Sequence, residues 1–202
     1  PLLVDIDTGF GSVLTVARTI AELERIGVAA VQIEDQPFLK RCGHRDGKAL
    51  ISVTAMCERI KAAVDARTDP QFVLMARTDA LALENLDATI ARISQYLEAG
   101  ADMIFLEAIT NFSQLEAVSK AIDVPVLVNS TEFGKTPIHT QALWGQHGAA
   151  MVLYPLSAFR CMAKAALDTY QTIIGTGSQT SLLEKMQTRK ELYDILNYEA
   201  YE

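Results

Sequence analysis

One cysteine lies in a strongly basic run of this chain, Lys-Arg-Cys-Gly-His-Arg from Lys40 to Arg45. Neighbouring cations favour the thiolate form of Cys42, and a thiol that exchanges a proton near neutral pH can act as a general acid or base. His44 could tune this thiol or donate to a ligand. Gly43 indicates a backbone that moves or approaches a ligand closely. The alternative is a basic surface loop with an unreactive cysteine.

Acidic residues follow the first two apolar runs. Asp5 and Asp7 stand two positions apart, so on one strand both side chains would point the same way, and Glu34 ends the next run. Such carboxylates suit a hard cation, Mg2+ or in its place Mn2+, bound together with waters and substrate oxygens. Glu34 would contact the ion through water. The alternative is that the two aspartates cap a helix that starts near Ser12.

Groups suited to a bound carboxylate follow the later apolar runs. Arg77 could clamp a carboxylate, or form a salt bridge with Glu107 or Asp79, and both roles are compatible. Asn129 and Thr131 offer neutral donors for a carboxylate or an enolate-like oxyanion, or they simply end a strand. Glu107 could orient Arg77 or bind a protonated ligand. The set fits carbon–carbon bond chemistry on a small polycarboxylate.

Six short, nearly continuous apolar runs are typical of parallel strands buried on both faces. The predicted strands are Leu2–Val4, Ala29–Ile33, Phe72–Ala76, Met103–Leu106, Val124–Val128 and Ala149–Leu153. Segments with helical periodicity separate them, and Gly27 and Gly100 stand where two helices must end. These predicted helices are Val13–Ile26, Thr54–Ala66, Leu86–Ala99 and Ser113–Ile122.

This alternation predicts βαβ units in an α/β fold. Polar groups follow all six strands, and in a closed TIM-type (β/α)8 barrel such ends meet on one face, whereas in an open sheet fewer would meet. The barrel is therefore the predicted fold, although any single strand-end residue can also cap the next helix, as Asp79 and Thr110 are expected to do. Because this barrel needs eight strands, about two βα units are expected to precede Pro1.

Residues 1–155 are predicted to form the barrel units, and residues 156–202 a helical extension of the same domain or one swapped onto a neighbouring subunit. The extension is expected to contain a helix over Ser157–Ile174, a linker from Gly175 to Ser178 and a second helix over Leu182–Tyr201. The apolar stripe of that last helix must pack on the barrel rim or on another subunit.

Composition excludes several classes of protein. The 202 residues carry a formal charge of −7, which argues against a nucleic-acid footprint, and no apolar run reaches the roughly 20 residues that span a bilayer. The three cysteines form no Cys-x-x-Cys pair, so a disulfide framework is not expected. A reducing, cytoplasmic setting is expected instead. His139, Trp144 and His147 are interpreted as structural.

Several motifs together resemble the isocitrate lyase/phosphoenolpyruvate mutase superfamily along the whole chain. They are Val4-Asp-Ile-Asp-Thr-Gly-Phe-Gly, Ile33-Glu-Asp-Gln, Lys40-Arg-Cys-Gly-His-Arg, Met75-Ala-Arg-Thr-Asp-Ala, Asn129-Ser-Thr-Glu-Phe-Gly, Leu153-Tyr-Pro-Leu-Ser-Ala-Phe-Arg and Met186-Gln-Thr-Arg-Lys-Glu-Leu-Tyr. The resemblance implies a (β/α)8 barrel whose last helices swap between subunits of a homotetramer. It also implies a lyase that splits 2-methylisocitrate into pyruvate and succinate, in the methylcitrate route of propionate breakdown.

The resemblance further implies roles for individual residues. Asp5 and Asp7 would hold Mg2+ with Glu34 in the outer shell. Cys42 and His44 would be catalytic, with Cys42 protonating the succinate carbanion from a gating loop. The implied substrate-binding residues are Gly43, Arg77, Phe105, Glu107, Asn129, Ser130, Thr131, Leu153, Arg160 and Arg189.

Two positions bear on the choice of substrate. Superfamily members that cleave isocitrate typically carry tryptophan where this chain has Phe105 and threonine where it has Leu153, so the pocket is expected to accept an extra methyl group. One methyl group contributes about 1–3 kcal/mol of discrimination, and cleavage of isocitrate to glyoxylate and succinate is one alternative. Another is a non-catalytic fragment that binds dicarboxylates, because a Tyr-x-Ser-Gly-Gly segment for the keto acid is expected upstream of Pro1.

Overall fold

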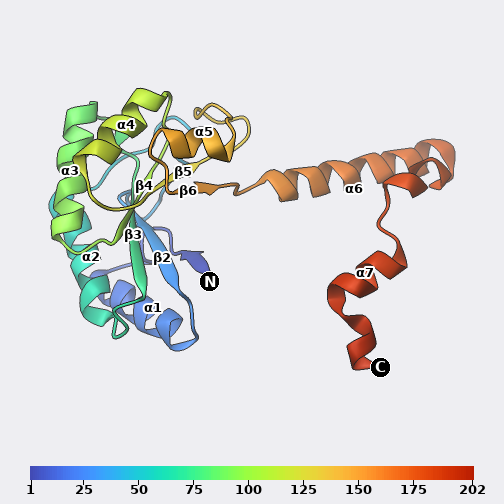
Figure 1. Ribbon diagram of the computed structural model, residues 1–202, viewed down its shortest axis with the longest axis horizontal. Coiled ribbons are helices and arrows are strands. Elements are labelled where there is room, and N and C mark those ends of the chain that lie inside the picture. The colour runs from blue at the N-terminus through green and yellow to red at the C-terminus, as the bar shows by residue number, and fades with distance from the viewer. The chain divides into compact units, whose positions relative to one another are not determined.

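The computed structural model describes all 202 residues, which fall into two compact units, residues 1–155 and 156–202. In the first unit six parallel strands pair in the order β1-β2-β3-β4-β5-β6. The sheet curls into a half-barrel, and α1 to α4 cover its outer side (Figure 1). The predicted α/β class with parallel βαβ units is confirmed, and the curled sheet is consistent with a TIM-like barrel.

The strands begin and end within two residues of their predicted limits. They are β1 (Leu3–Asp5), β2 (Ala30–Glu34), β3 (Val73–Thr78), β4 (Met103–Leu106), β5 (Val126–Asn129) and β6 (Met151–Leu153). Four of them run further than expected at the carboxyl end, because pairing continues into polar residues: Glu34 stands opposite Arg77, and Asn129 opposite Leu153. The polar groups are therefore held by the sheet itself.

The helices follow the apolar periodicity with one omission. They are α1 (Val13–Arg25), α2 (Val53–Ala66), the 3-10 turn η1 (Ala80–Ala82), α3 (Leu86–Glu98), α4 (Phe112–Ala121) and α5 (Gln141–Gln146). Helix α5 was not predicted, because six residues are too few to show a helical period. It is held by Trp144, which is fully buried and contacts Phe112 edge-on, while His147 stacks on the same ring. The structural interpretation of these side chains is confirmed.

Strand alternation sorts the side chains onto two faces of the sheet. Val31, Ile33 and their counterparts on the other strands point outward and form the main core against the helices. The intervening residues point to the inner face, where Met75, Phe105 and Leu127 form a small separate cluster. The polar residues at the strand ends share the parity of this inner cluster, so they gather above it.

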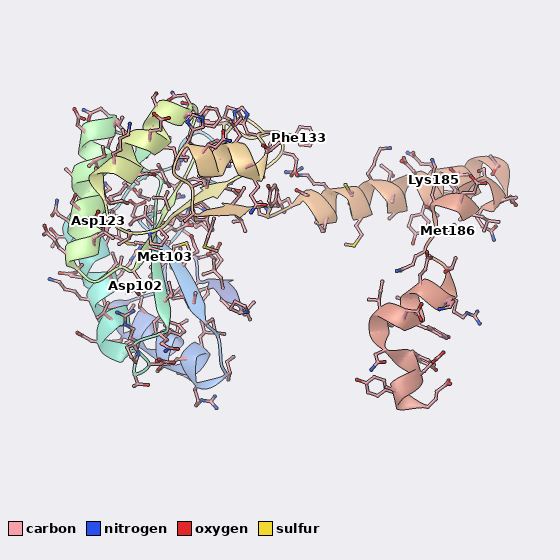
Figure 2. The ribbon with its side chains drawn as sticks, in the orientation of Figure 1. Asp102, Met103, Asp123, Phe133, Lys185 and Met186 are labelled. Atoms are coloured by element: carbon pink, nitrogen blue, oxygen red, sulfur yellow. The ribbon has the colours of Figure 1, made fainter.

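The second unit differs from its prediction. It contains α6 (Ser157–Thr176), η2 (Thr180–Lys185), α7 (Arg189–Leu196) and η3 (Tyr198–Tyr201). The linker was placed too early, since α6 continues to Thr176 and ends at the left-handed Gly177. The prediction of one continuous helix over Leu182–Tyr201 was wrong, because η2 ends at Lys185 and the backbone is extended at Met186 (Figure 2). Thr188 then starts α7 with a capping box.

No residue of the second unit is buried, and the chain contains no helix with the length and hydropathy that a bilayer span requires.

Two helix-terminating glycines provide a matched pair for a stability test. Gly27 and Gly100 both have positive φ angles, 86° and 109°, and each closes a helix with the same pair of backbone hydrogen bonds. A Cβ at Gly27 would meet nothing, whereas one at Gly100 would lie 2.8 Å from a methyl group of Val64. Gly27→Ala should therefore cost about 1 kcal/mol of unfolding free energy from backbone strain alone. Gly100→Ala should cost about 2–3 kcal/mol, measured by urea unfolding, and equal losses would contradict the predicted collision.

Candidate functional site

Three carboxylates converge where β1 and β2 end. One oxygen each of Asp5, Asp7 and Glu34 lies within 4.8 Å of the other two. Asp5 and Asp7 were predicted to point the same way because both would lie on one strand. In the structure Asp7 lies beyond β1, in a left-handed conformation (φ 51°). The turn brings the two aspartates together, and the Asp7 N–H donates to Asp5 Oδ1 at 2.8 Å.

The surroundings of these acids fit a divalent cation. Lys40 forms an ion pair with Asp7 and lies 3.6 Å from Glu34. Arg77 lies 3.5 Å from Glu34 but is shared with Asp79 and Glu107, so the acids still outnumber the cations. Both Glu34 oxygens are buried without a hydrogen-bond donor, and burial raises the pKa of Glu34 to about 7 against the opposing charges of Arg77 and Lys40. Oxygen ligands with excess negative charge are what Mg2+ requires. The helix-capping alternative is not supported, since the first turn of α1 holds no acidic residue.

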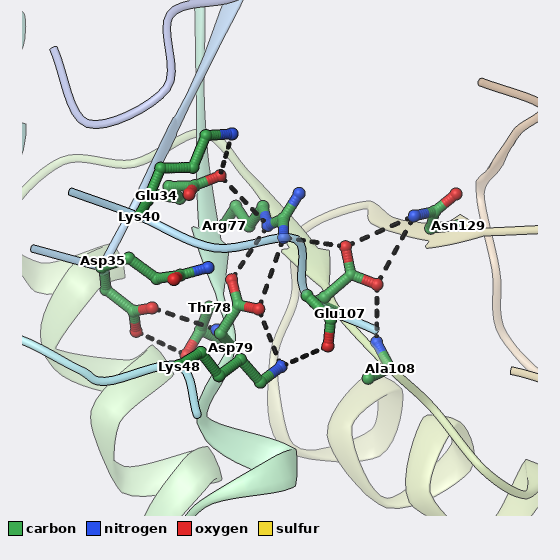
Figure 3. Close-up of polar contacts among 12 residues, drawn as sticks. Glu34, Asp35, Lys40, Lys48, Arg77, Thr78, Asp79, Glu107, Ala108 and Asn129 are labelled. Atoms are coloured by element: carbon green, nitrogen blue, oxygen red, sulfur yellow. Dashed lines mark hydrogen bonds and ion pairs between the residues drawn. The ribbon is translucent and has the colours of Figure 1, made fainter. Parts of the chain in front are cut away.

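Arg77 is the centre of the neighbouring polar cluster (Figure 3). Its guanidinium lies 3.0 Å from Asp79, 3.0 Å from Glu107 and 3.5 Å from Glu34, and it stands over the Phe105 ring. Burial alone would lower the pKa of Arg77, but these carboxylates outweigh it and raise the pKa. The predicted salt bridges to Glu107 and Asp79 are therefore confirmed, while the carboxylate clamp stays a prediction.

Glu107 collects donors from three segments. His44 Nε2 lies 2.9 Å from Glu107 Oε1, and Asn129 Nδ2 lies 3.3 Å from Oε2. The Lys135 N–H donates to His44 Nδ1, so the hydrogen-bond network assigns the imidazole proton to Nε2, which faces Glu107. Burial would raise the pKa of Glu107, but His44 and Arg77 lower it below its ordinary value. Glu107 is thus kept ionised and orients its partners.

Buried polar atoms without partners occur at the end of β5 and in the segment that follows it. Asn129 Oδ1, Ser130 Oγ and Thr136 Oγ1 are buried without a hydrogen-bond partner, and Thr131 is buried beside them. Buried polar groups in folded proteins are normally paired, so these atoms are available to a ligand. Thr136 was missed by the sequence analysis, since nothing in its local pattern distinguishes it. Leu153, at the end of β6, packs on the inner apolar cluster that includes Phe105.

The basic loop is seated on the Arg77 cluster. Cys42 is exposed, but Gly43 next to it is buried. A Cβ on Gly43 would lie 2.3 Å from Glu107 Cγ and 2.6 Å from Arg77 Nη2. Only glycine lets the backbone come so near, as the sequence analysis expected.

Several residues of the cluster escaped the sequence analysis. The salt bridge of Asp79 with Arg77 was predicted, but its bond with the buried Lys48, whose Nζ lies 2.9 Å away, was not, and the Asp79 side chain does not cap η1. Asp35 is fully buried and accepts from the Tyr96 hydroxyl at 2.8 Å and from the Asp79 N–H at 3.0 Å. Burial raises the pKa of Asp35, although these donors oppose it. No local signal marks Lys48 or Tyr96, because their partners lie 31 and 61 positions away.

One further expectation is wrong and two are not tested. Thr110 does not cap α4, since Asn111 is the capping residue. Arg160 in α6 and Arg189 at the start of α7 are exposed residues of the second unit. Their contact with substrate stays a prediction.

Comparison with known proteins identifies the family. A model of the phosphoenolpyruvate phosphomutase family matches residues 1–174. The 2-methylisocitrate lyase of Shewanella oneidensis is 54% identical over 202 residues, and that of Escherichia coli is 53% identical over 203 residues. Each alignment covers 100% of this chain and 69% of the relative.

Solved structures agree with this result. A 2,3-dimethylmalate lyase described as a PEP mutase/isocitrate lyase superfamily member has a TM-score of 0.91 and 34% identity, over 100% of this chain and 67% of that chain. A phosphonopyruvate hydrolase solved with oxalate and Mg2+ has a TM-score of 0.84 and 27% identity, over 100% and 70% of the two chains.

The chain therefore belongs to the phosphoenolpyruvate phosphomutase family, in the phosphoenolpyruvate mutase/isocitrate lyase superfamily of enzymes. Curated relatives that are 52–54% identical to it are 2-methylisocitrate lyases, which places it with the carbon–carbon lyases of that superfamily. The resemblance drawn from the motifs is confirmed.

The lowered pKa of Glu107 predicts a pH-dependent contribution to stability. Because the folded-state pKa lies below the ordinary value, the charge of Glu107 stabilises the fold above that value, and this stabilisation is lost as the pH falls through the lowered pKa. Glu107→Gln should lower the unfolding free energy by about 2–4 kcal/mol near neutral pH, since it leaves Arg77 less compensated. Urea unfolding should show a smaller difference below about pH 4.

The partly exposed pair of Glu116 with His147, which lies outside the Arg77 cluster, provides the control. Glu116→Gln should change stability little at any of these pH values. A Glu107→Gln loss that does not vary with pH would contradict the predicted linkage.

Proposed function

We propose that this protein cleaves 2-methylisocitrate to pyruvate and succinate, as a step of the methylcitrate route of propionate breakdown. The observation that carries the proposal is the junction at Glu34. This buried acid lies within 4.8 Å of the Asp5 and Asp7 oxygens and 3.5 Å from Arg77, so a cation site adjoins a carboxylate-binding side. The curated 2-methylisocitrate lyases, 45–54% identical over nearly the entire chain, support this substrate.

Asp5 and Asp7 would hold Mg2+, or Mn2+ in its place, with Glu34 in the outer shell. When bound, the ion supplies positive charge that stabilises negative charge on an α-hydroxy or α-keto carboxylate. Two observations support this assignment: the three acids outnumber the cations beside them, and the Glu34 oxygens receive no hydrogen bond. The hydrolase structure that contains oxalate and Mg2+ supports it independently.

The remaining residues would serve the succinate half of the substrate. Arg77 supplies a fixed positive charge, and Asn129, Ser130 and Thr131 supply neutral polar contacts at the end of β5. Glu107 holds Arg77, Asn129 and His44 in place. These contacts would orient two carboxylates relative to the bond that breaks.

Cys42 would complete the reaction. When the carbon–carbon bond breaks, its electron pair stays with the succinate carbon, and the Cys42 thiol delivers a proton there. The other half loses its hydroxyl proton to solvent as its C–O bond becomes the keto group of pyruvate, so one proton leaves oxygen for each proton that Cys42 delivers to carbon. The seating of Gly43 and His44 on the Arg77 cluster supports a loop that carries the thiol to the substrate.

Phe105 and Leu153 would select the methylated substrate. Both belong to the inner apolar cluster below the polar groups, so a methyl group placed there loses contact with water. One methyl group in such a pocket gives roughly 10- to 200-fold discrimination, and isocitrate would be a poor substrate rather than an excluded one.

We also propose the larger assembly. The chain covers 69% of the Shewanella relative, which leaves room for the βα units of a complete (β/α)8 barrel in the whole protein. Residues 156–202 would extend residues 1–155 or swap between subunits of a homotetramer, which would bury exposed apolar residues such as Phe159 and Ile195 and bring Arg160 and Arg189 to a substrate. The three free cysteines support a cytoplasmic location.

A pyruvate-release assay tests the proposed reaction. With Mg2+, 2-methylisocitrate should yield pyruvate and succinate in equal amounts, and kcat/KM should exceed that for isocitrate by roughly tenfold or more. Chelation by EDTA should abolish release, and added Mg2+ should restore it. Turnover that survives chelation would contradict the metal assignment, and a preference for isocitrate would contradict the proposed substrate.

The proton-transfer role of Cys42 has its own test. Cys42→Ser should lower kcat by about 100-fold or more, because a hydroxyl is a far weaker acid than a thiol, while Mg2+-dependent succinate binding by calorimetry persists. Cys57→Ser and Cys161→Ser are matched controls that should keep wild-type rates. A Cys42→Ser protein with normal turnover would show that the thiol is not the acid.

A further inference from the structure

One buried lysine of the thiol-bearing loop has no role in the proposed chemistry. The side chain of Lys48 is only 1% exposed, and its Nζ donates to two acceptors. One is the backbone carbonyl of Gly43 at 2.6 Å, and the other is Asp79 Oδ1 at 2.9 Å. Figure 3 shows this ammonium group between the loop and the strand-end acids.

The first acceptor lies at the point of the loop that matters most for catalysis. Gly43 stands between Cys42 and His44, so its carbonyl orientation sets the backbone from which both side chains leave. The same turn is closed by the Arg45 N–H, which donates to the Cys42 carbonyl at 2.9 Å. Lys48 therefore holds the peptide group that joins the two proposed catalytic residues.

The second acceptor is a rigid part of the barrel. Asp79 follows β3, binds the Arg77 guanidinium at 3.0 Å, and its N–H donates to the buried Asp35. Burial opposes ionisation of Asp79, but Arg77 and Lys48 lower its pKa and keep it charged. The contact with Lys48 is thus a buried, charge-assisted hydrogen bond to a fixed point.

The ion pairs that other lysines make at this loop are more exposed to water. Lys135 pairs with Asp46, whose side chains are 39% and 95% exposed, and Lys40 pairs with Asp7 at 30% and 45%. Exposed pairs of this kind contribute little, because solvent screens them. Among the lysine contacts of the loop, that of Lys48 is the one shielded from this screening.

We propose that Lys48 is a positioning residue that fastens the Cys42–His44 segment to Asp79 and so keeps the loop seated over the Arg77 cluster. It acts through Gly43 and Asp79, since its own ammonium group is enclosed by them. The catalytic consequence rests on the proposed function, because it is Cys42 whose placement would suffer. The structural consequence does not rest on it.

The experiment compares the intact protein with Lys48→Met by hydrogen–deuterium exchange and kinetics. Exchange of the amides from residue 40 to residue 47 should become about tenfold faster or more, while amides of β3 and α2 keep wild-type protection. With 2-methylisocitrate and Mg2+, kcat should fall about tenfold or more with a smaller change in KM, because the thiol is misplaced after substrate binds. Lys48→Arg, which keeps the charge, should recover part of both.

The matched control is Lys120→Met on α4, whose lysine is 80% exposed and 4.0 Å from Glu116. It should leave loop exchange and kcat unchanged. Lys48→Gln provides a second neutral variant if Lys48→Met does not fold, because its shorter side chain cannot reach both acceptors.

The outcomes separate this inference from the proposed reaction. Faster exchange confined to the loop supports the inference even if no lyase activity is found, in which case the proposed function fails alone. Loop exchange equal to that of Lys120→Met overturns the inference even if the protein is a 2-methylisocitrate lyase. Faster exchange throughout β3 and α2 also overturns it, since the lysine would then stabilise the whole fold.

Discussion

The structure depends on the compensation of buried charge around Arg77. A guanidinium removed from water is stable only if carboxylates surround it in good geometry, and here Glu34, Asp79 and Glu107 do so from three consecutive strand ends. Each of these acids would in turn be unstable without a cation. The charges therefore require one register of β2, β3 and β4, which the apolar cores on both faces also favour.

This compensation joins two chemical environments. Glu34 contacts Arg77 on one side and completes the Asp5 and Asp7 cluster on the other, and its oxygens receive no hydrogen bond. Glu107, which pairs with Arg77, also binds the side chains of His44 and Asn129 and so fixes their positions. A small acid bound between them would meet excess negative charge suited to a cation at one end and fixed polar donors at the other. The arrangement is consistent with the proposed binding of a substrate whose two halves differ.

Much of the architecture could be predicted from the sequence because local patterns encode it. Buried parallel strands are short continuous apolar runs, and Gly27 and Gly100 end their helices with left-handed backbones that few other residues tolerate. Helix α5 escaped prediction because its six residues show no periodic pattern and its Trp144 is held by packing against the distant Phe112. The prediction of one final helix failed because the Thr188 cap and the left-handed Asn197 interrupt an otherwise periodic segment.

The amino-acid sequence by itself determined which chemical groups stand at the strand ends and the family they define. Only the tertiary structure decided other partnerships: that Asp79 also binds Lys48, that Gly43 lies against Glu107, and that a turn rather than strand alternation pairs Asp5 with Asp7. The physical reason is range. Periodicity and capping act over a few residues, whereas buried charges choose partners by distance and desolvation across the folded sheet.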